Sequence, residues 1–224
     1  MPTTRTRRSA PAPSPAGPDL EAKARPRQER ALDTFERILA VTAELLGEVG
    51  IERLSTNLVC ERAGLTPPAL YRYFPNKYAL LRELGERLMA VQNDLLAAWA
   101  TPATMKLARA DFERSVLVLF AQTLELTQQV PGGVWITRAL RAVPALQEVR
   151  IGSHRHVTGL IEDAFMSAWP QADRSHVRVL ARLAVEAAYA TTEMLFDDPA
   201  LDAQAVGTTL AAMIGSQIVA LRKT

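Results

Sequence analysis

The segment from Ala63 to Lys77 constrains the fold more than any other part of the chain. Its sequence, AGLTPPALYRYFPNK, combines a glycine, a capping residue, prolines, aromatic residues and a cation within fifteen residues. Gly64 supplies the backbone freedom that a sharp turn between two helices needs. The segment therefore predicts a helix-turn-helix whose second helix begins just after the glycine.

The helix after this turn has a defined start. Thr66 is the expected N-cap, because its hydroxyl can accept a hydrogen bond from the amide of Ala69. Pro67 and Pro68 then occupy the first turn, where amides have no partner within the helix and a missing donor costs little. The two prolines thus start a helix of about two turns, predicted from Thr66 to Tyr73.

The same helix also has a defined end. Pro75 disfavours helical geometry at Phe74, and Asn76 is suited to cap a new helix that begins at Lys77. A helix of two turns cannot stand alone in water, so it must pack on its neighbours. This is how a recognition helix is held while its N-terminal end enters the major groove.

Two helices are predicted upstream. The first runs from about Glu29 to Val49, with Gly50 as its C-cap. The second takes Ser55 or Thr56 as its cap and ends at Gly64. The apolar stripe of the first helix consists of Phe35, Ile38, Leu39, Thr42, Leu45, Leu46 and Val49. Three helices, the last two joined by a tight turn, form a compact domain.

These elements, in this order, resemble the tetracycline-repressor (TetR) family over roughly residues 29 to 80. The chain departs from the family pattern at Pro68, where a small residue is common, and at Cys60, where alanine is common. The resemblance implies an all-α protein of about nine helices, with an N-terminal three-helix helix-turn-helix domain followed by an α-helical ligand-binding and dimerisation domain. The motifs that carry it are Gly50, Leu54-Ser55-Thr56, Ala63-Gly64-Leu65-Thr66 and Tyr71-x-Tyr73-Phe74-x-x-Lys77.

Three regions are predicted along the chain. Residues 1–24 form a disordered, basic and proline-rich arm, residues 25–78 the helix-turn-helix domain, and residues 79–224 the helical effector-binding and dimerisation domain. Residues 1–78 carry 12 Lys and Arg against 9 Asp and Glu, so the basic excess lies on the predicted DNA-binding side. Within the arm and its junction, Arg25 and Arg27 either contact phosphates or a minor groove, or are simply solvated.

The resemblance implies that the helix-turn-helix binds a double-stranded DNA operator. Thr56 and Lys77 are expected to anchor phosphates, while the start of the recognition helix meets base edges or thymine methyl groups. Tyr71 and Tyr73 are alternatively core residues, and Phe74 is expected in the core. The predicted DNA-contacting set is Arg30, Ser55, Thr56, Thr66, Pro67, Pro68, Ala69, Tyr71, Arg72, Tyr73 and Lys77.

Beyond Lys77 the chain shows apolar stripes at helical spacing and no alternation of period two. No apolar run is judged long enough to span a bilayer, and Arg7-Arg8 precedes no apolar signal region, so a cytoplasmic protein is expected. The predicted helices run from Lys77 to Trp99, from about Phe112 to Thr127, from Trp135 to Val143, from Pro144 to Trp169, from Asp173 to Phe196 and from Leu201 to Leu221.

Large side chains in this region are candidates for a mostly apolar effector site, although a stripe of aromatic residues is more often plain core. His154 can supply a polar handle, but it cannot share a metal with His156, because the two side chains lie about 200° apart on a helix. No metal and no cofactor is therefore expected. The candidate ligand-binding set is Met89, Trp99, Phe112, Phe120, Trp135, Arg138, His154 and Phe165.

The last two helices are rich in small residues and carry apolar stripes, which either pack within one subunit or form a homodimer. The resemblance favours the homodimer, because a two-fold operator needs a symmetric partner. The predicted interface set is Val177, Leu180, Ala184, Ala188, Thr191, Leu195, Leu210, Met213, Gln217 and Leu221.

Enzymatic activity receives no support, because the sequence lacks a nucleotide-binding glycine fingerprint, a paired-histidine zinc helix and a Gly-x-Ser-x-Gly elbow. The single cysteine, Cys60, is either a buried small hydrophobe or a redox sensor. The expected function is that of a ligand-responsive transcriptional repressor, and the resemblance to the TetR family implies that an effector bound in the body tilts the helix from Lys77 to Trp99. The alternative is a helical small-molecule-binding or interaction protein without operator-specific DNA binding, which would show no salt-sensitive operator complex.

Overall fold

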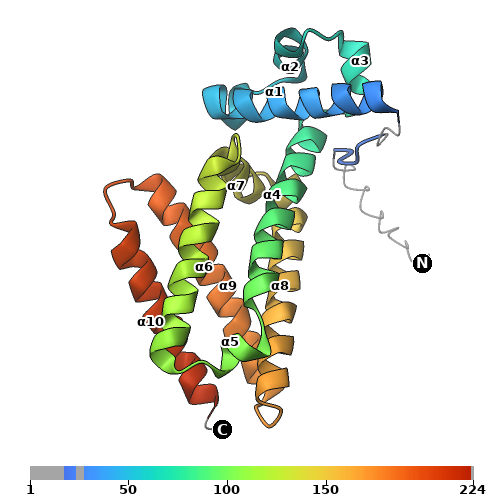
Figure 1. The fold of residues 1–224 in the computed structure, drawn as a ribbon. Helices are drawn as coiled ribbons and strands as arrows, with labels where there is room; N and C mark the ends of the chain where they lie inside the picture. Colours follow the sequence, from blue (N-terminus) through green and yellow to red (C-terminus); the bar gives the residue numbers. More distant parts are fainter. Residues whose placement is uncertain (1–17, 24–27, 223–224) are drawn as a thin grey trace, which may run out of the picture.

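The computed structural model describes residues 18–23 and 28–222, which form ten α-helices, one 3₁₀ helix and no strand. Helices α1 to α3 make a small headpiece that lies across one end of a long helical body (Figure 1). The prediction of an all-α fold with an N-terminal helix-turn-helix is confirmed. The count is ten α-helices rather than about nine.

The headpiece consists of α1 (Glu29–Arg53), α2 (Thr56–Ala63) and α3 (Pro67–Tyr71). Gly50 adopts a φ of 73°, which breaks the helical geometry one residue after the predicted end of the first helix. Ser55 is the N-cap of α2, as predicted, because its side chain accepts from the amide of Leu58.

The recognition helix differs from its prediction. Helix α3 spans five residues, shorter than the predicted range from Thr66 to Tyr73. The Thr66 side chain makes no cap hydrogen bond; the Ala69 amide bonds instead to the backbone carbonyl of Thr66, at 2.9 Å. The predicted side-chain cap is therefore wrong, because the backbone closes this turn by itself. Gly64 supplies the turn before it in a left-handed conformation, with a φ of 62°.

Helix α4 leads from the headpiece into the body and begins where the sequence predicts. The side chain of Asn76 accepts from the amides of Tyr78 and Ala79 and so caps the helix. The body contains α4 (Lys77–Trp99), α5 (Pro102–Lys106), α6 (Arg109–Gln129), α7 (Gly133–Ala142), a 3₁₀ helix (Pro144–Leu146), α8 (Gln147–Ala168), α9 (Arg174–Asp197) and α10 (Ala203–Leu221).

The sequence analysis missed helix α5. Its signals are local: the Thr101 side chain accepts from the amide of Thr104, and Pro102 occupies the first turn. The helix predicted from Pro144 also differs, since its first residues form the 3₁₀ helix and the α-helix starts at Gln147.

Helix α10 corrects a second expectation. It is long and apolar enough to cross a membrane by length and composition, although the sequence analysis found no such run. In the fold it packs on α6 and α9 and buries Leu210, Ala211 and Ile218. Helix α10 thus packs as part of the helical body.

The described end of the predicted arm lies against the headpiece. The amide of Lys23 donates to the carbonyl of Tyr73 at 2.8 Å, and the Asn76 side-chain amide donates to the carbonyl of Asp19 at 2.7 Å. Residues 1–17, 24–27 and 223–224 lie outside the described residues, and with them most of the predicted arm, Arg25, Arg27 and the predicted domain boundary.

Among the described residues, two large hydrophobic cores form beside a smaller cluster of Phe120, Leu195 and Leu210. One fills the headpiece and its junction with α4 and α7, around Phe35, Phe74 and Leu80. The other lies between α5, α6, α8, α9 and α10, around Phe112 and Phe165. Helix α4 contributes to the first core with its N-terminal half and packs Leu96 and Trp99 against the second, so it is one of the helices that link the two cores.

Candidate nucleic-acid interface and ligand cavity

The outer surface of α2 and α3 carries exposed side chains on a fixed frame. Tyr71 is 40% exposed, and its hydroxyl forms a 3.0 Å hydrogen bond with the hydroxyl of Thr56 on α2. Thr66 and Arg72 are also exposed, and no described contact ties up the Arg72 guanidinium beyond its position over the Tyr73 ring. This surface therefore offers an oriented phenol and a free cation to a partner.

The start of α3 presents mainly apolar atoms. Pro67 and Pro68 are exposed and have no amide hydrogen, and Ala69 is half-buried behind them. A partner that approaches this end thus meets ring and methyl groups, while hydrogen bonds must come from the neighbouring side chains.

Tyr73 lies in the core rather than on this surface. Its ring packs edge-on against Phe35, with 6.1 Å between the ring centroids, and Phe74 stacks on the same ring at 4.8 Å. Tyr73 is only 7% exposed and Phe74 is fully buried. Of the two alternatives for Tyr73, the structure selects the core, and the expectation for Phe74 is confirmed.

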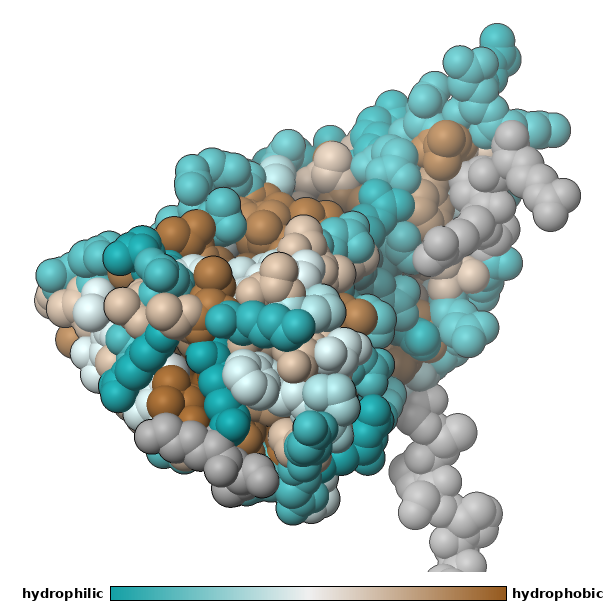
Figure 2. Space-filling model, turned by 60° about the horizontal axis from the view of Figure 1, so that its bottom comes forward, coloured by the Kyte–Doolittle hydropathy of each residue, from teal (hydrophilic) through white to brown (hydrophobic). Residues whose placement is uncertain are grey.

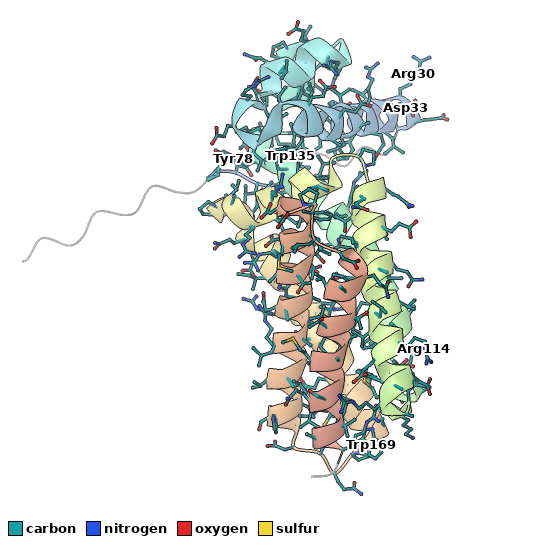
Figure 3. The ribbon with its side chains drawn as sticks, turned by 90° about the vertical axis from the view of Figure 1, so that its left-hand side faces the viewer. Arg30, Asp33, Tyr78, Arg114, Trp135 and Trp169 are labelled. Carbon is teal, nitrogen blue, oxygen red and sulfur yellow. The ribbon has the colours of Figure 1, made fainter. Side chains whose placement is uncertain are left out.

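Lys77 also differs from its expected role as a phosphate anchor. Its ammonium donates to the carbonyls of Ile51 and Leu54, both at 3.2 Å. These carbonyls lie at the end of α1, where they have no partner within the helix. Lys77 thus ties α4 to α1. Arg30, by contrast, lies exposed at the start of α1 and points away from the body (Figure 3).

Cys60 is buried in the headpiece core, and burial raises the pKa of its thiol. A raised pKa keeps the thiol protonated and unreactive. Of the two alternatives for this residue, the structure favours the small hydrophobe.

The body contains an apolar cavity of about 100 Å³ between α4, α6, α8, α9 and α10. Of the predicted ligand-binding residues, Trp99, Phe112, Phe120 and Phe165 line it. None of the described residues that line it is charged; Thr123 is the polar one, and its hydroxyl bonds to the carbonyl of Leu119 in its own helix. This volume and this lining suit a small, neutral and apolar molecule.

At the end of the body opposite the headpiece, two side chains hold α5 and the residue that follows it. Arg222 donates to the carbonyls of Leu107 and Met105, at 2.7 and 2.6 Å, and Trp169 donates to the same Met105 carbonyl. Trp169 lies at the end of the body opposite the headpiece (Figure 3). Figure 2 brings this end forward and shows hydrophobic residues between hydrophilic ones on its surface.

The remaining predicted ligand-binding residues lie outside this cavity. Met89 and Trp135 belong to the core that joins the headpiece to α4 and α7. The Arg138 guanidinium lies 4.9 Å from the centre of the Trp135 ring and forms a 2.8 Å ion pair with Asp197. Apolar spacing shows that these side chains face inward, but not which of the two cores they enter.

His154 is fully buried and is held by a carboxylate. Its Nδ1 lies 2.9 Å from Oε1 of Glu186, which also pairs with Arg150 and Arg182, while its Nε2 has no hydrogen-bond partner among the described residues. Burial lowers the pKa of His154, although Glu186 opposes this effect. The imidazole is thus neutral and donates from Nδ1. His154 does not line the cavity, so its predicted role as a ligand handle is not supported.

The predicted dimer residues divide into two groups. Val177, Leu180, Ala184, Ala188, Leu210 and Leu221 line the cavity, and Leu195 is buried beside it. Thr191 is half-buried, whereas Met213 and Gln217 are exposed. Most of the predicted stripe therefore packs inside one subunit, the alternative that the sequence left open.

A different face of the last two helices is exposed and apolar. It carries Val179, Leu183 and Met194 on α9 and Met213 on α10, with exposed fractions of 57%, 61%, 44% and 61%. The first three recur at helical spacing, so they share one side of α9. Large apolar side chains grouped on one face indicate a surface that a partner covers.

No group of three or more His, Cys, Asp or Glu side chains that could hold a metal occurs within residues 18–23 and 28–222. The polar residues that lie next to the cavity, Gln92, Thr127 and Tyr189, were not predicted as functional. Their signal in the sequence is weak: each is a polar residue within an apolar helical stripe.

The model of the family "Bacterial regulatory proteins, tetR family" matches residues 38–84, which include most of the headpiece and the start of α4. The class C tetracycline repressor of Escherichia coli is 41% identical over 58 residues, and the class G repressor of Vibrio anguillarum is 44% identical over 52 residues. The first match spans 26% of this chain and 26% of the repressor. The chain thus aligns with only about a quarter of these relatives' length.

Solved structures share the fold over most of the chain. The SmeT–triclosan complex has a TM-score of 0.63 at 19% identity and covers 83% of this chain and 91% of SmeT. A regulator of the TetR family from Syntrophomonas wolfei has a TM-score of 0.64 at 11% identity, with 84% and 95% covered. The headpiece is thus similar in sequence to the tetR family of bacterial regulatory proteins, and the chain as a whole shares the fold of these solved regulators.

Proposed function

We propose that this protein is a transcriptional repressor that binds a palindromic operator as a homodimer and is released by a small, neutral, mostly apolar effector. One observation carries the proposal: an exposed helix-turn-helix, in a domain that matches the tetR family, is joined by a single helix to a body that encloses an apolar cavity. Such a regulator acts on DNA in the cytoplasm.

The DNA contacts follow from the surface of α2 and α3. Tyr71 and Arg72 supply the polar contacts, and the Pro67 and Pro68 rings face base edges or thymine methyl groups. Thr56 fixes the Tyr71 phenol and lies near enough to share a phosphate contact. Arg30 is an additional cation for the backbone.

The dimer is proposed to form through the exposed apolar face of α9 and α10, defined by Val179, Leu183, Met194 and Met213. Two copies of this helix pair would build a four-helix bundle around a two-fold axis. Leu183→Glu and Met213→Glu should each give a monomer in light scattering, because each buries a charge in the interface. Val118→Glu places the same charge on the exposed face of α6 and should leave the dimer intact. A dimer that persists in both interface variants would move the interface elsewhere.

The effector is proposed to occupy the cavity in the body. The described lining offers no charged group, so a charged ligand would lose its hydration without compensation. The structure of SmeT, which has the same fold, holds triclosan. That structure supports a small-molecule effector for this fold.

The test is selection of bound duplexes from a random-sequence library, followed by fluorescence anisotropy on the enriched sequence. A palindromic sequence should be enriched, and its affinity should fall steeply as salt rises. Arg72→Ala and Tyr71→Ala should each weaken binding about tenfold or more. Arg114→Ala, an exposed arginine on α6 far from the headpiece (Figure 3), should change affinity less than about twofold.

Two outcomes would decide against this function. Enrichment of no sequence would support the alternative, a helical small-molecule-binding or interaction protein without operator-specific DNA binding. Enrichment with equal losses for Arg72→Ala and Arg114→Ala would keep DNA binding but reject the assigned surface.

A further inference from the structure

A hydrogen-bonded layer crosses the body between the cavity and the headpiece. The Gln92 side chain on α4 lies at its centre, 6% exposed. Its amide nitrogen donates to the hydroxyl of Thr127 on α6 at 2.8 Å, and its oxygen accepts from the hydroxyl of Tyr189 on α9, also at 2.8 Å. One side chain of α4 thus holds two other helices.

The direction of each bond in this layer is fixed. The single hydrogen of the Thr127 hydroxyl goes to the carbonyl of Thr123 at 2.7 Å, so this oxygen can only accept from Gln92. Burial raises the pKa of Tyr189 to about 12, so its phenol stays protonated and donates. Gln92 therefore fits in one orientation, with its nitrogen toward α6 and its oxygen toward α9.

The Tyr189 ring is itself held in place. It packs on the ring of His154 on α8, with 4.1 Å between the ring centroids, and His154 is fixed by Glu186. A second tie joins α8 to α4, because the Ser153 hydroxyl donates to the side-chain oxygen of Asn93 at 2.7 Å. The layer thus connects α4 with the other helices from three sides.

The layer adjoins the cavity. Thr123, whose carbonyl accepts from Thr127, lines the cavity, and so does Ala188, the neighbour of Tyr189. On the opposite side, Met89 lies one turn nearer the headpiece on α4 and belongs to the headpiece core. A molecule in the cavity that moved α6 or α9 outward would therefore stretch the hydrogen bond of Gln92 to Thr127 or to Tyr189.

We propose that Gln92 and Tyr189 are positioning residues that hold α4 in the register that binds DNA when the cavity is empty, and that occupancy of the cavity breaks this layer. The inference rests on the proposed function. Apolar contacts re-form after a small slide of a helix, but these bonds do not, and a slide leaves buried polar groups unpaired. The layer therefore gives α4 discrete positions, which a ligand can redistribute.

The test compares operator affinity with the cavity empty and filled. The full chain is titrated with the selected operator, alone and with saturating N-phenyl-1-naphthylamine, a neutral apolar fluorophore. Ala184→Leu, which points a larger side chain into the cavity, fills it without a ligand. In the otherwise unchanged protein, both fillings should weaken operator binding at least about fivefold.

Tyr189→Phe and Gln92→Leu should remove this response. Each variant should bind operator with nearly the same reduced affinity whether the cavity is empty or filled, within about twofold. Thr192→Val is the matched control: it removes a buried hydroxyl from α9 that bonds only within its own helix, to the Ala188 carbonyl. This control should keep the full response of operator binding to cavity filling. If loss of any buried hydroxyl were enough to remove the response, Thr192→Val would remove it too.

The proposal is overturned if Tyr189→Phe keeps the full response, or if neither filling affects operator binding in the otherwise unchanged protein. If no operator is enriched, the proposed function fails while the layer is still testable. Hydrogen exchange of residues 77–84 at the start of α4 should then quicken on cavity filling in the unchanged protein but not in Tyr189→Phe. Equal behaviour of the two proteins in this assay would reject the layer as well.

Discussion

The headpiece and the body are both helical, but one has a filled core and the other a hollow one. In the headpiece, Phe35 stacks on Phe74, and both are buried among the aliphatic side chains of α1, α2 and α4. In the body, Phe112 and Phe165 line a cavity of about 100 Å³. This contrast fits the proposed function, in which the headpiece presents side chains to DNA at fixed positions and the body admits a small molecule.

The largest difference between the two cores is expected when an aromatic side chain in each is replaced by alanine. Phe74→Ala should lower the free energy of unfolding by about 3–5 kcal/mol, because a fully enclosed ring leaves a cavity behind. Phe120→Ala, in the cavity wall, should cost less, since part of that ring already faces empty space. Urea unfolding of both variants measures this difference, and equal costs would show that the body is not hollow in solution.

Enlarging a small side chain should also affect the two cores differently, with the larger loss of stability in the filled one. Ala139→Leu adds volume to the filled junction with α7, where Ala139 is 1% exposed, and should cost about 1–3 kcal/mol. Ala184→Leu adds the same atoms on the side of the cavity and should change stability by less than about 1 kcal/mol. Thermal and urea unfolding would show whether the two positions differ; a large penalty at Ala184 would contradict an open cavity.

Sensitivity to pH should lie in the body, which contains all three histidines of the chain. Burial lowers the pKa of His154, while Glu186 opposes the shift and Arg150 and Arg182 add to it; Tyr189 packs on the ring. Unfolding therefore takes up a proton below the ordinary histidine pKa of 6.5, and stability should fall by on the order of 1 kcal/mol between about pH 7.5 and 5.5.

His154→Asn should flatten this dependence, since the amide does not titrate in that range. The matched variant His176→Asn changes an exposed histidine and should leave the slope as it is. A slope that survives His154→Asn would place the titrating group elsewhere.

The smallest effect is expected at an ion pair between the two regions. Arg87 on α4 donates to both carboxylate oxygens of Glu36 on α1, at 2.6 and 2.8 Å, and this hydrogen bonding lowers the pKa of Glu36. Both side chains are nearly half exposed, so solvent screens the pair and Glu36→Gln should cost less than about 1 kcal/mol. The difference should be present near neutral pH, begin to shrink as the pH falls through about 4.5, the ordinary pKa of the carboxyl group, and vanish only below the lowered pKa of Glu36 in the folded protein.

The headpiece was predictable because its signals are local. Gly64, Ser55 and Asn76 each set the backbone of their own turn, and the structure confirms all three. Thr66 shows the limit of such signals, because the backbone carbonyl replaced its hydroxyl as the partner of the Ala69 amide.

The body was predictable only in part, since its arrangement depends on which helix covers which face. Helix α9 is apolar on two sides, and periodicity alone does not show which side faces the cavity and which faces out. Ala184, predicted at the dimer interface, therefore lines the cavity, whereas Leu183, which was not predicted, is exposed. Trp99 and Trp135 are both tryptophans, yet they pack into different cores. The core that each one joins depends on its position along the long axis of the body.

The unbroken length of α4 has a mechanical consequence. From Gln92 to Lys77 the helix extends about 22 Å, at 1.5 Å per residue. Once the layer at Gln92 is broken, a swing of this segment by about 5° would carry the headpiece end through about 2 Å, and a two-fold partner would double the change in separation to about 4 Å, against the roughly 34 Å between successive major grooves. A lever of this length can convert a displacement of a few tenths of an ångström at the cavity wall into a mismatch on DNA.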